Sequence, residues 1–428
     1  MAVNQSSPEL FAGEAVREHQ ERLLCELVPR LYERSPFYRR KLREAGIDPR
    51  EIRTLDDLAY VPFTTKDELR EGYPLGLMAV PEEEVVRIHS SSGTTGKPVI
   101  VPYTARDVEI WSILFARCYA MAGVTAWDRV QITPGYGLWT AGIGFQAGAE
   151  RLGAMVVPMG PGNTEKQLQM MVDMRSTVLT ATSSYALLLA EEITRRGLRE
   201  HIHLRCGIFG SERWGSRMRA RIEEMLGIES FDIYGLTEVY GPGIAIDCPA
   251  HVGLHYWSDH LLFEIIDPAT GKRLPPGAEG ELVITTLTKE GMPLLRYRTR
   301  DITCLIPDPC PCGNPYPLMS RVLGRSDDMI KFKGVNIFPG QIDHVLKKTP
   351  GVSSEYRIIL TREQGRDSML IRVEGEPGAT PADVAVLFRK NVKVYIGVTV
   401  DVEIVPYGSL PRSEKKTKRI IDRRDDLE

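Results

Sequence analysis

Residues 89–101 read HSSSGTTGKPVIV, a run of small hydroxyl and glycine residues that ends in a lysine and continues into an apolar segment. Glycine lets a backbone approach a ligand closely, hydroxyl groups donate hydrogen bonds, and lysine adds positive charge. The run is therefore typical of a loop that folds over phosphate groups. The same composition occurs in surface linkers, so the interpretation depends on partners elsewhere in the chain.

The segments around this loop predict an α/β protein. Downstream, short β-rich runs near Val130 and Val156 alternate with amphipathic helices at 165–174 and 185–196. Such alternation indicates a sheet of parallel strands covered by helices. Upstream, apolar residues at helical spacing predict a helical segment over 14–47, with Gly46 as its stop signal.

The second half of the chain has a different pattern. Residues 261–305 contain the runs LLFEII, ELVITTL and DITCLI, separated by turn residues, which predicts an antiparallel β subdomain. After Gly324, helical segments and the strands RIILT, MLIRVEG and VDVEIV predict a compact α+β unit. We therefore predict a large N-terminal domain with αβ-layered sheets and a β subdomain, residues 1–326, and a small C-terminal α+β domain, residues 327–428.

The composition excludes several classes of protein. The 54 basic residues nearly balance the 57 acidic ones, so no overall field favours nucleic acid or a membrane surface. The first twenty residues lack the features of a secretory signal, and no apolar run approaches the length of a membrane span. Seven cysteines, an odd number, argue against a disulfide framework. We expect a cytoplasmic protein whose function depends on a local site.

Four further segments place polar residues directly after apolar runs, where α/β proteins bind ligands. They are IFGSER at 208–213, FDIYGLTE at 231–238, YRTRD at 297–301 and GRSDDMIKFKG at 324–334. With the first loop, and in this order, they resemble the adenylate-forming superfamily of acyl-CoA synthetases, luciferases and adenylation domains. The chain looks most like the phenylacetate-CoA ligase family of aryl-CoA ligases, also through SPFYRRKLREAGI at 35–47, CPCG at 310–313 and GSLPRSEKKTKRIID at 408–422.

This resemblance covers nearly the whole chain and implies the adenylate-forming enzyme fold with a two-step reaction. A carboxylate attacks the α-phosphorus of ATP, pyrophosphate leaves, and the thiol of CoA captures the acyl adenylate. The loop lacks the GxxxxGK[ST] spacing of a P-loop, which argues against transfer of the γ-phosphate. Two alternatives stay open: an enzyme that loads a carrier protein instead of CoA, and a non-catalytic homologue. The sequence does not determine the oligomeric state, although dimers are the commonest oligomers and a homodimer is considered.

The resemblance implies an ATP site whose residues are spread over the chain. The loop residues Ser91, Ser92, Gly93, Thr94, Thr95, Gly96 and Lys97 would wrap the β- and γ-phosphates. Thr237 would contact the α-phosphate, and Glu238 would hold Mg²⁺, which prefers oxygen ligands. Tyr234 and Gly235 would lie against adenine, with Gly210, Ser211 and Glu212 along its edge. Asp301 would accept the ribose hydroxyls, and Arg325 would reach the ribose and phosphates.

The resemblance also assigns roles in the C-terminal domain. Lys416 would stabilise charge in the adenylation step. Lys415 stands where family members usually carry glycine, so Lys415 or Lys418 is an alternative, and a solvated basic tail is the other explanation. Asp327 corresponds to the family hinge, about which this domain would move between two poses. Lys333 and Gly334 would then approach CoA.

Residues 134–148, PGYGLWTAGIGFQAG, combine aromatic and small side chains, which suits a flat slot for a ring. The matching family segment lines the aryl pocket, so Tyr136, Trp139, Ile143 and Ala147 are the candidates, although core packing explains them equally well. No unpaired charge marks the stretch. We therefore expect an uncharged aromatic body with one carboxylate, such as phenylacetate, indoleacetate or a benzoate.

Cysteine and histidine residues suggest a structural zinc site. Thiolates and imidazoles are zinc ligands, and four of them close a tetrahedron. Some members of the resembled family carry zinc at positions that match Cys248, His255, Cys310 and Cys312. His251 is an alternative to His255, and buried reduced thiols are the alternative to a metal. The other cysteines, Cys25, Cys118, Cys206 and Cys304, are interpreted as small core residues.

Overall fold

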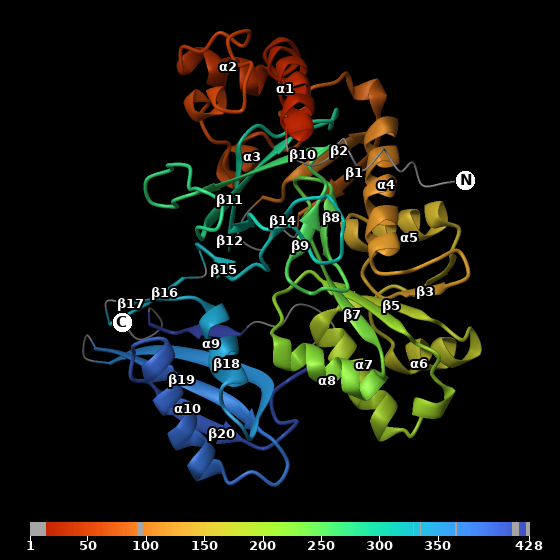
Figure 1. Cartoon of the computed structure of the whole chain (residues 1–428), viewed down its shortest axis with the longest axis vertical. Helices are drawn as coiled ribbons and strands as arrows, with labels where there is room; N and C mark the ends of the chain where they lie inside the picture. The colour runs from red at the N-terminus through yellow and green to blue at the C-terminus, as the bar shows by residue number, and fades with distance from the viewer. Residues whose placement is uncertain are drawn as a thin grey trace.

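The computed structural model describes residues 14–91, 97–327, 329–333, 335–363, 366–412 and 419–424. Figure 1 shows a large upper body, coloured red to cyan, and a smaller blue body that carries the last elements of the chain. Each body has its own hydrophobic core, and the core of the smaller one is built from residues between Ile330 and Val400. Among the described residues, no helix is long and apolar enough to span a bilayer.

The described part of the chain begins with helices that cover a sheet of the N-terminal domain. They are α1 (Glu14–Arg34), α2 (Pro36–Glu44) and α3 (Lys66–Glu71). A proline at its first position starts α2, and Gly46 follows its end with a φ of +68°. Leu27 and Leu31 of α1 pack with Leu42 of α2 onto Leu262, which confirms the predicted helical segment and places it on a β-layer.

The central sheet follows from the predicted alternation of strands and helices. Its order is β13-β14-β9-β8-β7-β6-β5-β3-β4, and the pairs from β7 to β4 are parallel. These parallel strands are β3 (Arg129–Ile132), β4 (Met155–Pro158), β5 (Val178–Thr182), β6 (Cys206–Gly210) and β7 (Glu229–Leu236). The antiparallel extension by β8 (Gly241–Asp247), β9 (Leu254–Tyr256), β13 (Leu305–Ile306) and β14 (Leu318–Met319) was not predicted from the sequence.

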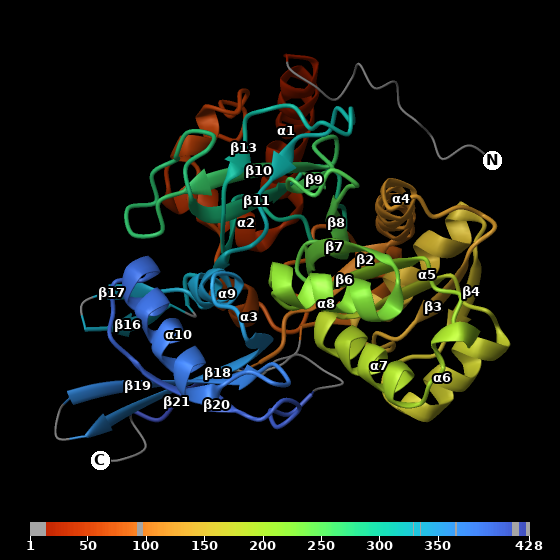
Figure 2. The ribbon, with the colours of Figure 1, turned by 60° about the horizontal axis from the view of Figure 1, so that its bottom comes forward.

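Helices cover both faces of this sheet. They are α4 (Ala105–Met121) and α5 (Thr140–Leu152) on one face, and α7 (Ser183–Arg195) and α8 (Ser216–Leu226) on the other, with α6 (Thr164–Asp173) beside α7 (Figure 2). Successive residues of β6 show the division: Ile208 packs in the core that includes Trp111 of α4, whereas Phe209 packs in the core that includes Ile222 of α8. The stretch 89–101 begins in β1 (Val85–Ser90) and ends in β2 (Ile100–Thr104), which pair as an antiparallel hairpin.

The predicted antiparallel subdomain is present, with one change. Its order is β10-β11-β12-β15, with β10 (Leu261–Ile266), β11 (Gly280–Thr286), β12 (Tyr297–Thr303) and β15 (Gly324–Arg325). The run DITCLI is divided: β12 ends at Thr303 in this sheet, and Leu305 begins β13 in the central sheet. Periodicity could not show this division, because β13 is only two residues long.

The C-terminal unit is α+β, as predicted. After the hairpin of β16 (Ile330–Phe332) and β17 (Val335–Ile337), α9 (Pro339–Lys347) and α10 (Pro381–Tyr395) accompany a sheet of order β20-β19-β18-β21. Its strands are β18 (Val352–Glu363), β19 (Arg366–Gly375), β20 (Asp401–Val405) and β21 (Ile420–Asp422). The boundary at residue 326 stays a prediction.

Candidate active site

The ends of two neighbouring parallel strands form the centre of the candidate site. β6 ends at Gly210, which lies opposite Ile233 of β7, so residues 210–212 and 234–238 are brought side by side. Gly235 allows this packing: a Cβ atom there would lie 2.0 Å from the carbonyl oxygen of Gly241. Larger residues therefore cannot replace this glycine without moving the backbone of β8.

Tyr234, Asp301 and Arg325 form a hydrogen-bonded group. The Tyr234 hydroxyl donates to Asp301 Oδ2 at 2.6 Å, and Arg325 Nη1 donates to Asp301 Oδ1 at 3.1 Å. Antiparallel pairing of β12 with β15 places Asp301 directly opposite Arg325. Burial raises the pKa of Asp301 above its ordinary value, while the Arg325 charge and the Tyr234 hydroxyl act in the opposite direction. The carboxylate is thus held by both of its oxygens.

Glu238 follows β7 and is buried, with 4% of its surface exposed. Lys66 Nζ lies 2.9 Å from Glu238 Oε1. Sequence reasoning missed Lys66. Thr65 and Glu68 form a capping box at the start of α3, but this local pattern does not show what Lys66, the first residue of the helix, contacts. Thr237 lies beside Glu238 in the same turn and is half-buried.

A second lysine, Lys289, contacts the backbone of the turn that contains Glu238. Lys289 is fully buried, and its Nζ donates to the carbonyl oxygen of Val239, next to Glu238. The same nitrogen lies 4.4 Å from the ring centroid of Tyr103 and 4.8 Å from that of Tyr240. Burial lowers the pKa of Lys289 to about 7, although the charges of Asp107 and Glu238 act to raise it. No sequence motif indicated this residue.

The two ends of the predicted phosphate loop are described, whereas Ser92, Gly93, Thr94, Thr95 and Gly96 lie outside the described residues. Ser91 closes the base of the loop: its amide donates to the Val99 carbonyl at 3.0 Å, and its Oγ accepts from the Val99 amide at 2.9 Å. Lys97 is exposed, and its Nζ lies 5.5 Å from the ring centroid of Tyr73.

Ser211 and Glu212, predicted at the adenine edge, follow β6 directly. Ser211 has a φ of +67°, an unfavourable region for a residue with a Cβ atom. Glu212 Oε1 accepts from the Ser184 amide at 2.6 Å and from Ser183 Oγ at 3.1 Å. The Glu212 side chain therefore caps the start of α7. Because this carboxylate is already occupied, residues 210–212 offer a ligand mainly their backbone groups.

Of the four predicted aryl-pocket residues, Tyr136 precedes α5, Trp139 is at its start, and Ile143 and Ala147 lie along it. Trp139 is the N-cap and is 49% exposed, whereas Tyr136 and Ile143 pack against the main core. Ile143 and Ala147 are one helical turn apart and half-buried, so they share a face of α5. Burial raises the pKa of Tyr136 to about 12, which keeps its phenol neutral. This placement is compatible with both a pocket and core packing.

The predicted hinge residue Asp327 lies in the segment that connects the two bodies, and the predicted CoA residue Lys333 lies in the hairpin of β16 and β17 that follows it. Asp327 accepts from Arg325 Nε at 2.8 Å and lies 3.4 Å from Arg300 Nη1. Burial acts to raise the pKa of Asp327, but the hydrogen bonds and charge of Arg325 outweigh it and lower the pKa. Lys333 is exposed at the turn after β16. Gly334, Lys415, Lys416 and Lys418 lie outside the described residues.

Cys248, His255, Cys310 and Cys312 come together as predicted, with all four potential ligand atoms within 4.8 Å of one another. Cys248 Sγ lies 3.5 Å from Cys310 Sγ, and Cys312 Sγ lies 3.3 Å from His255 Nε2. His255 Nδ1 lies 2.6 Å from the Tyr316 carbonyl oxygen, to which it donates, so Nε2 is left to face the thiols.

His251, the alternative ligand, belongs to a different network. Its Nδ1 lies 3.0 Å from Asp247 Oδ2, and the buried Asp247 also accepts from Arg219 Nη2 at 2.6 Å. The interpretation of the other cysteines as core residues is correct for Cys118 and Cys206, which are buried. It is wrong for Cys25, which is exposed, because this residue lies on the outer face of α1.

Comparisons with known proteins cover both bodies. The family model described as "AMP-binding enzyme" matches residues 11–288, and "AMP-binding enzyme C-terminal domain" matches residues 334–424. The chain is 44% identical over 424 residues to a phenylacetate-coenzyme A ligase of Pseudomonas putida, covering 97% of this chain and 96% of that one. A phenylacetate-coenzyme A ligase of Thermus thermophilus is 43% identical over 441 residues, covering 98% and 99%.

One solved enzyme, a 2-hydroxyisobutyryl-CoA ligase, matches in two states. Its postadenylation state with 2-HIB-AMP has a TM-score of 0.90 at 30% identity, covering 100% of this chain and 96% of that one. Its thioesterification state with 2-HIB-AMP and CoA has a TM-score of 0.71 at 30% identity, covering 99% and 95%. The two states have the same sequence identity to this chain and nearly the same coverage. The difference between their TM-scores therefore reflects a different arrangement of the domains in the two states.

Proposed function

Because the chain belongs to the phenylacetate-CoA ligase family of AMP-binding enzymes, we propose that its acid substrate is an arylacetate, with phenylacetate preferred over indoleacetate or a benzoate. The observation that carries this proposal is identity of 43–44% with curated phenylacetate-CoA ligases over nearly the whole chain. The predicted aryl segment is compatible with it, since the phenol of Tyr136 is neutral and Ile143 and Ala147 are half-buried.

The chain is an AMP-forming acid–thiol ligase. The acid is activated as an acyl adenylate, with release of pyrophosphate, and the acyl group is then transferred to the thiol of CoA. Both substrates of the first step are anions, so the site must neutralise charge and hold them in line.

We assign the roles in this step residue by residue. Residues 91–97 would hold the pyrophosphate part of ATP. Asp301, oriented by Tyr234 and Arg325, would accept the ribose hydroxyls. The backbone of 210–212 would border adenine, and Thr237 would contact the α-phosphate. Lys416 would stabilise the charge that develops between the carboxylate and the α-phosphorus.

Two metal ions fit the donor atoms present. Glu238 offers Mg²⁺ the carboxylate oxygen that it prefers, and bound Mg²⁺ neutralises phosphate charge. Lys66, 2.9 Å from the same carboxylate, would supply a second positive charge next to the phosphates. In the cysteine cluster, the separations of 3.5 and 3.3 Å are close to the roughly 3.5–3.8 Å expected between ligands of a tetrahedral zinc ion. Such a site is closed, so zinc would be structural. It would tie β9 to the segment before β14.

The test is acid-dependent exchange of labelled pyrophosphate into ATP, followed by thioester formation with CoA. We expect exchange with several aromatic acids and the highest kcat/KM with phenylacetate. No exchange with any acid of a broad panel would contradict the assignment, and faster loss of the adenylate with a phosphopantetheinyl carrier than with CoA would point to the carrier-loading alternative.

A further inference from the structure

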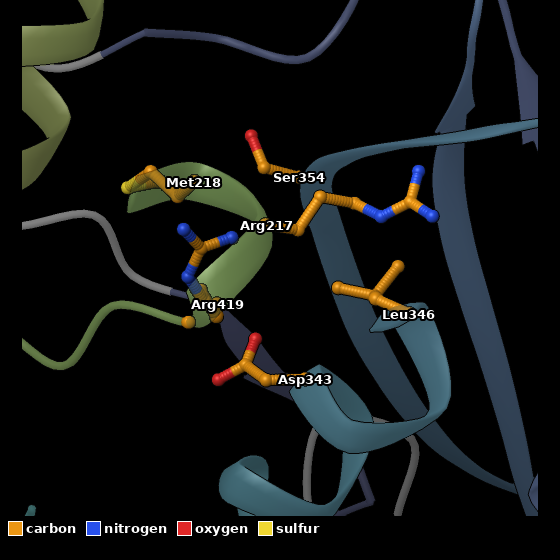
Figure 3. Close-up of a pocket in the computed structure, with 7 residues that line it drawn as sticks. Arg217, Met218, Asp343, Leu346, Ser354 and Arg419 are labelled. Carbon is orange, nitrogen blue, oxygen red and sulfur yellow. The ribbon is translucent and has the colours of Figure 1, made fainter. Parts of the chain in front are cut away.

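The contact between the two bodies is rich in arginine. Arg217 and Arg221 are four residues apart on α8, so they form a stripe on one face of this helix, and Arg213 lies just before its start. Arg213 Nη1 binds Asp343 of α9, and Arg217 Nη2 donates to the Thr349 carbonyl at 3.0 Å. Figure 3 shows Arg217, Asp343 and Arg419 around one small cavity at this contact. Its volume of about 10 Å³ leaves room for one water at most, so it is not a substrate site.

The stripe continues into a cluster around Glu191, defined by Glu191, Arg221, Glu374, Tyr407 and Arg412. Arg412 lies between two carboxylates: it donates to Glu191 Oε2 from Nε at 3.0 Å and to Glu374 Oε1 from Nη1 at 2.8 Å. Arg221 donates to Glu191 Oε1 at 2.5 Å. Glu191 and Arg221 belong to the N-terminal body, whereas the other three residues belong to the C-terminal body.

Burial makes this cluster stronger than an ordinary surface ion pair. The side chain of Arg412 is 11% exposed, that of Arg221 is 15% exposed, and that of Glu374 is fully buried. Charge-assisted hydrogen bonds with two contacts per carboxylate are both stronger and more directional than single contacts. The cluster therefore favours one relative orientation of the two bodies over others.

The comparison of states indicates which orientation this is. The whole chain, with the cluster formed, superposes on the postadenylation state of the related ligase with a TM-score of 0.90, and on the thioesterification state with only 0.71. Arg412 also directly precedes residues 413–418, the segment that contains Lys416.

We propose that Glu191 is a positioning residue for adenylation: through Arg412 it holds the C-terminal body in the orientation of the first half-reaction. This inference rests on the proposed two-step function. Loss of the Glu191 charge should slow adenylate formation selectively, because transfer to CoA does not need this orientation. Arg412 keeps Glu374 as a partner, so the substitution does not leave it as an uncompensated buried charge.

The test compares Glu191→Gln with Glu192→Gln. Glu192 is the next residue on α7, but its partners Arg195 and Arg196 are on the same helix. We expect Glu191→Gln to lower acid-dependent pyrophosphate exchange about tenfold while thioester formation from supplied acyl adenylate and CoA stays within twofold of wild type. Glu192→Gln should stay within twofold in both assays, and Glu191→Asp, which keeps the charge, should recover part of the exchange.

A readout besides activity is small-angle X-ray scattering of the free proteins, which is sensitive to the relative orientation of the two bodies. The scattering curve of Glu191→Gln should differ from that of wild type, and the curve of Glu192→Gln should not. Equal losses in both half-reactions, or unchanged exchange and scattering in Glu191→Gln, would overturn the proposal. Absence of exchange in the wild-type protein would instead refute the proposed function, and the scattering comparison would still decide whether Glu191 holds the orientation.

Discussion

Lys416 is the residue whose loss should separate the two half-reactions. Because its charge is needed only where the carboxylate attacks the α-phosphorus, Lys416→Ala should lower adenylation at least tenfold and affect use of a preformed adenylate less. Lys415→Ala and Lys418→Ala are the matched controls, measured by the same exchange assay. Equal loss in both steps would reject the role, and a larger effect at Lys415 or Lys418 would move it to that residue.

The cysteine cluster leads to a prediction about metal content. We expect about one zinc per chain in the purified protein, and Cys312→Ser should lower both the zinc content and the thermal midpoint, because it removes one of four ligands. Cys25→Ser, also at an exposed cysteine but far from the cluster in sequence, should change neither. Elemental analysis and thermal unfolding provide the measurements. A stable wild-type protein without zinc would show that these thiols are simply packed together.

Lys289 should make stability depend on pH. Its pKa is about 7 in the folded protein and ~10.4 when unfolded. Between these values the unfolded chain binds more protons, so this residue makes the free energy of unfolding rise as pH increases from 7 to 10. Lys289→Met should remove that contribution, whereas the exposed Lys272→Met should keep it. Denaturant unfolding at pH 7 and 9 gives the free energy of unfolding of both variants and of wild type. An equal change with pH in wild type and in Lys289→Met would contradict the burial argument.

At the scale of single elements, α5 is the part on which substrate selection should depend. Ala147 and Ile143 share its half-buried face, so Ala147→Leu should fill part of an aryl slot and raise KM for the acid about tenfold, with little change in KM for ATP. Gln146→Leu places the same side chain at the neighbouring position and is the control. If the two variants have the same KM for the acid, this face of α5 packs in the core and does not line the slot.

Local patterns predicted the elements well and their assembly less well. The strands near Val130 and Val156 and the helices α6 and α7 are found where the alternation indicated them. In the antiparallel extension of the central sheet, β13 and β14 were missed because each is two residues long, too short for a periodicity to be recognised. The longer strand β8 was missed because it begins with Gly-Pro-Gly, residues that are depleted in strands. Lys66 and Lys289 were missed for a related reason: their partners, Glu238 and the Val239 carbonyl, are distant in sequence, and no motif joins them.

At the scale of the whole molecule, the family was recognisable because several motifs occur in one order, and the comparisons confirm it. The relative orientation of the two bodies could not be predicted in this way. It depends on pairs such as Glu191 and Arg412, which lie 221 residues apart and carry no local signature.

A covalent link between the two bodies should hold them in one step of the reaction. A Cβ atom built on Gly215 of the N-terminal body would lie 3.1 Å from Asp343 Cβ on α9, slightly below the roughly 3.5–4.5 Å of a disulfide. After oxidation, the variant Gly215→Cys/Asp343→Cys should retain pyrophosphate exchange and lose thioester formation, and reduction should restore the second step. The single variants are the controls, and thioester formation by the oxidised double variant would show that transfer to CoA proceeds in this orientation.

The separation of Glu191 from Arg412 also has a consequence for how the protein is made. Translation completes the last strand of the central sheet, β14, at Met319, 93 residues before it reaches Arg412. At about 5–20 residues per second, a growing chain spends roughly 5–20 s in that interval. During this time, Arg221 is the only arginine of the Glu191 cluster that has been synthesised, so within that cluster the Glu191 carboxylate can form an ion pair with Arg221 alone. The N-terminal body therefore has time to fold on the ribosome before the contacts that set its working orientation can form.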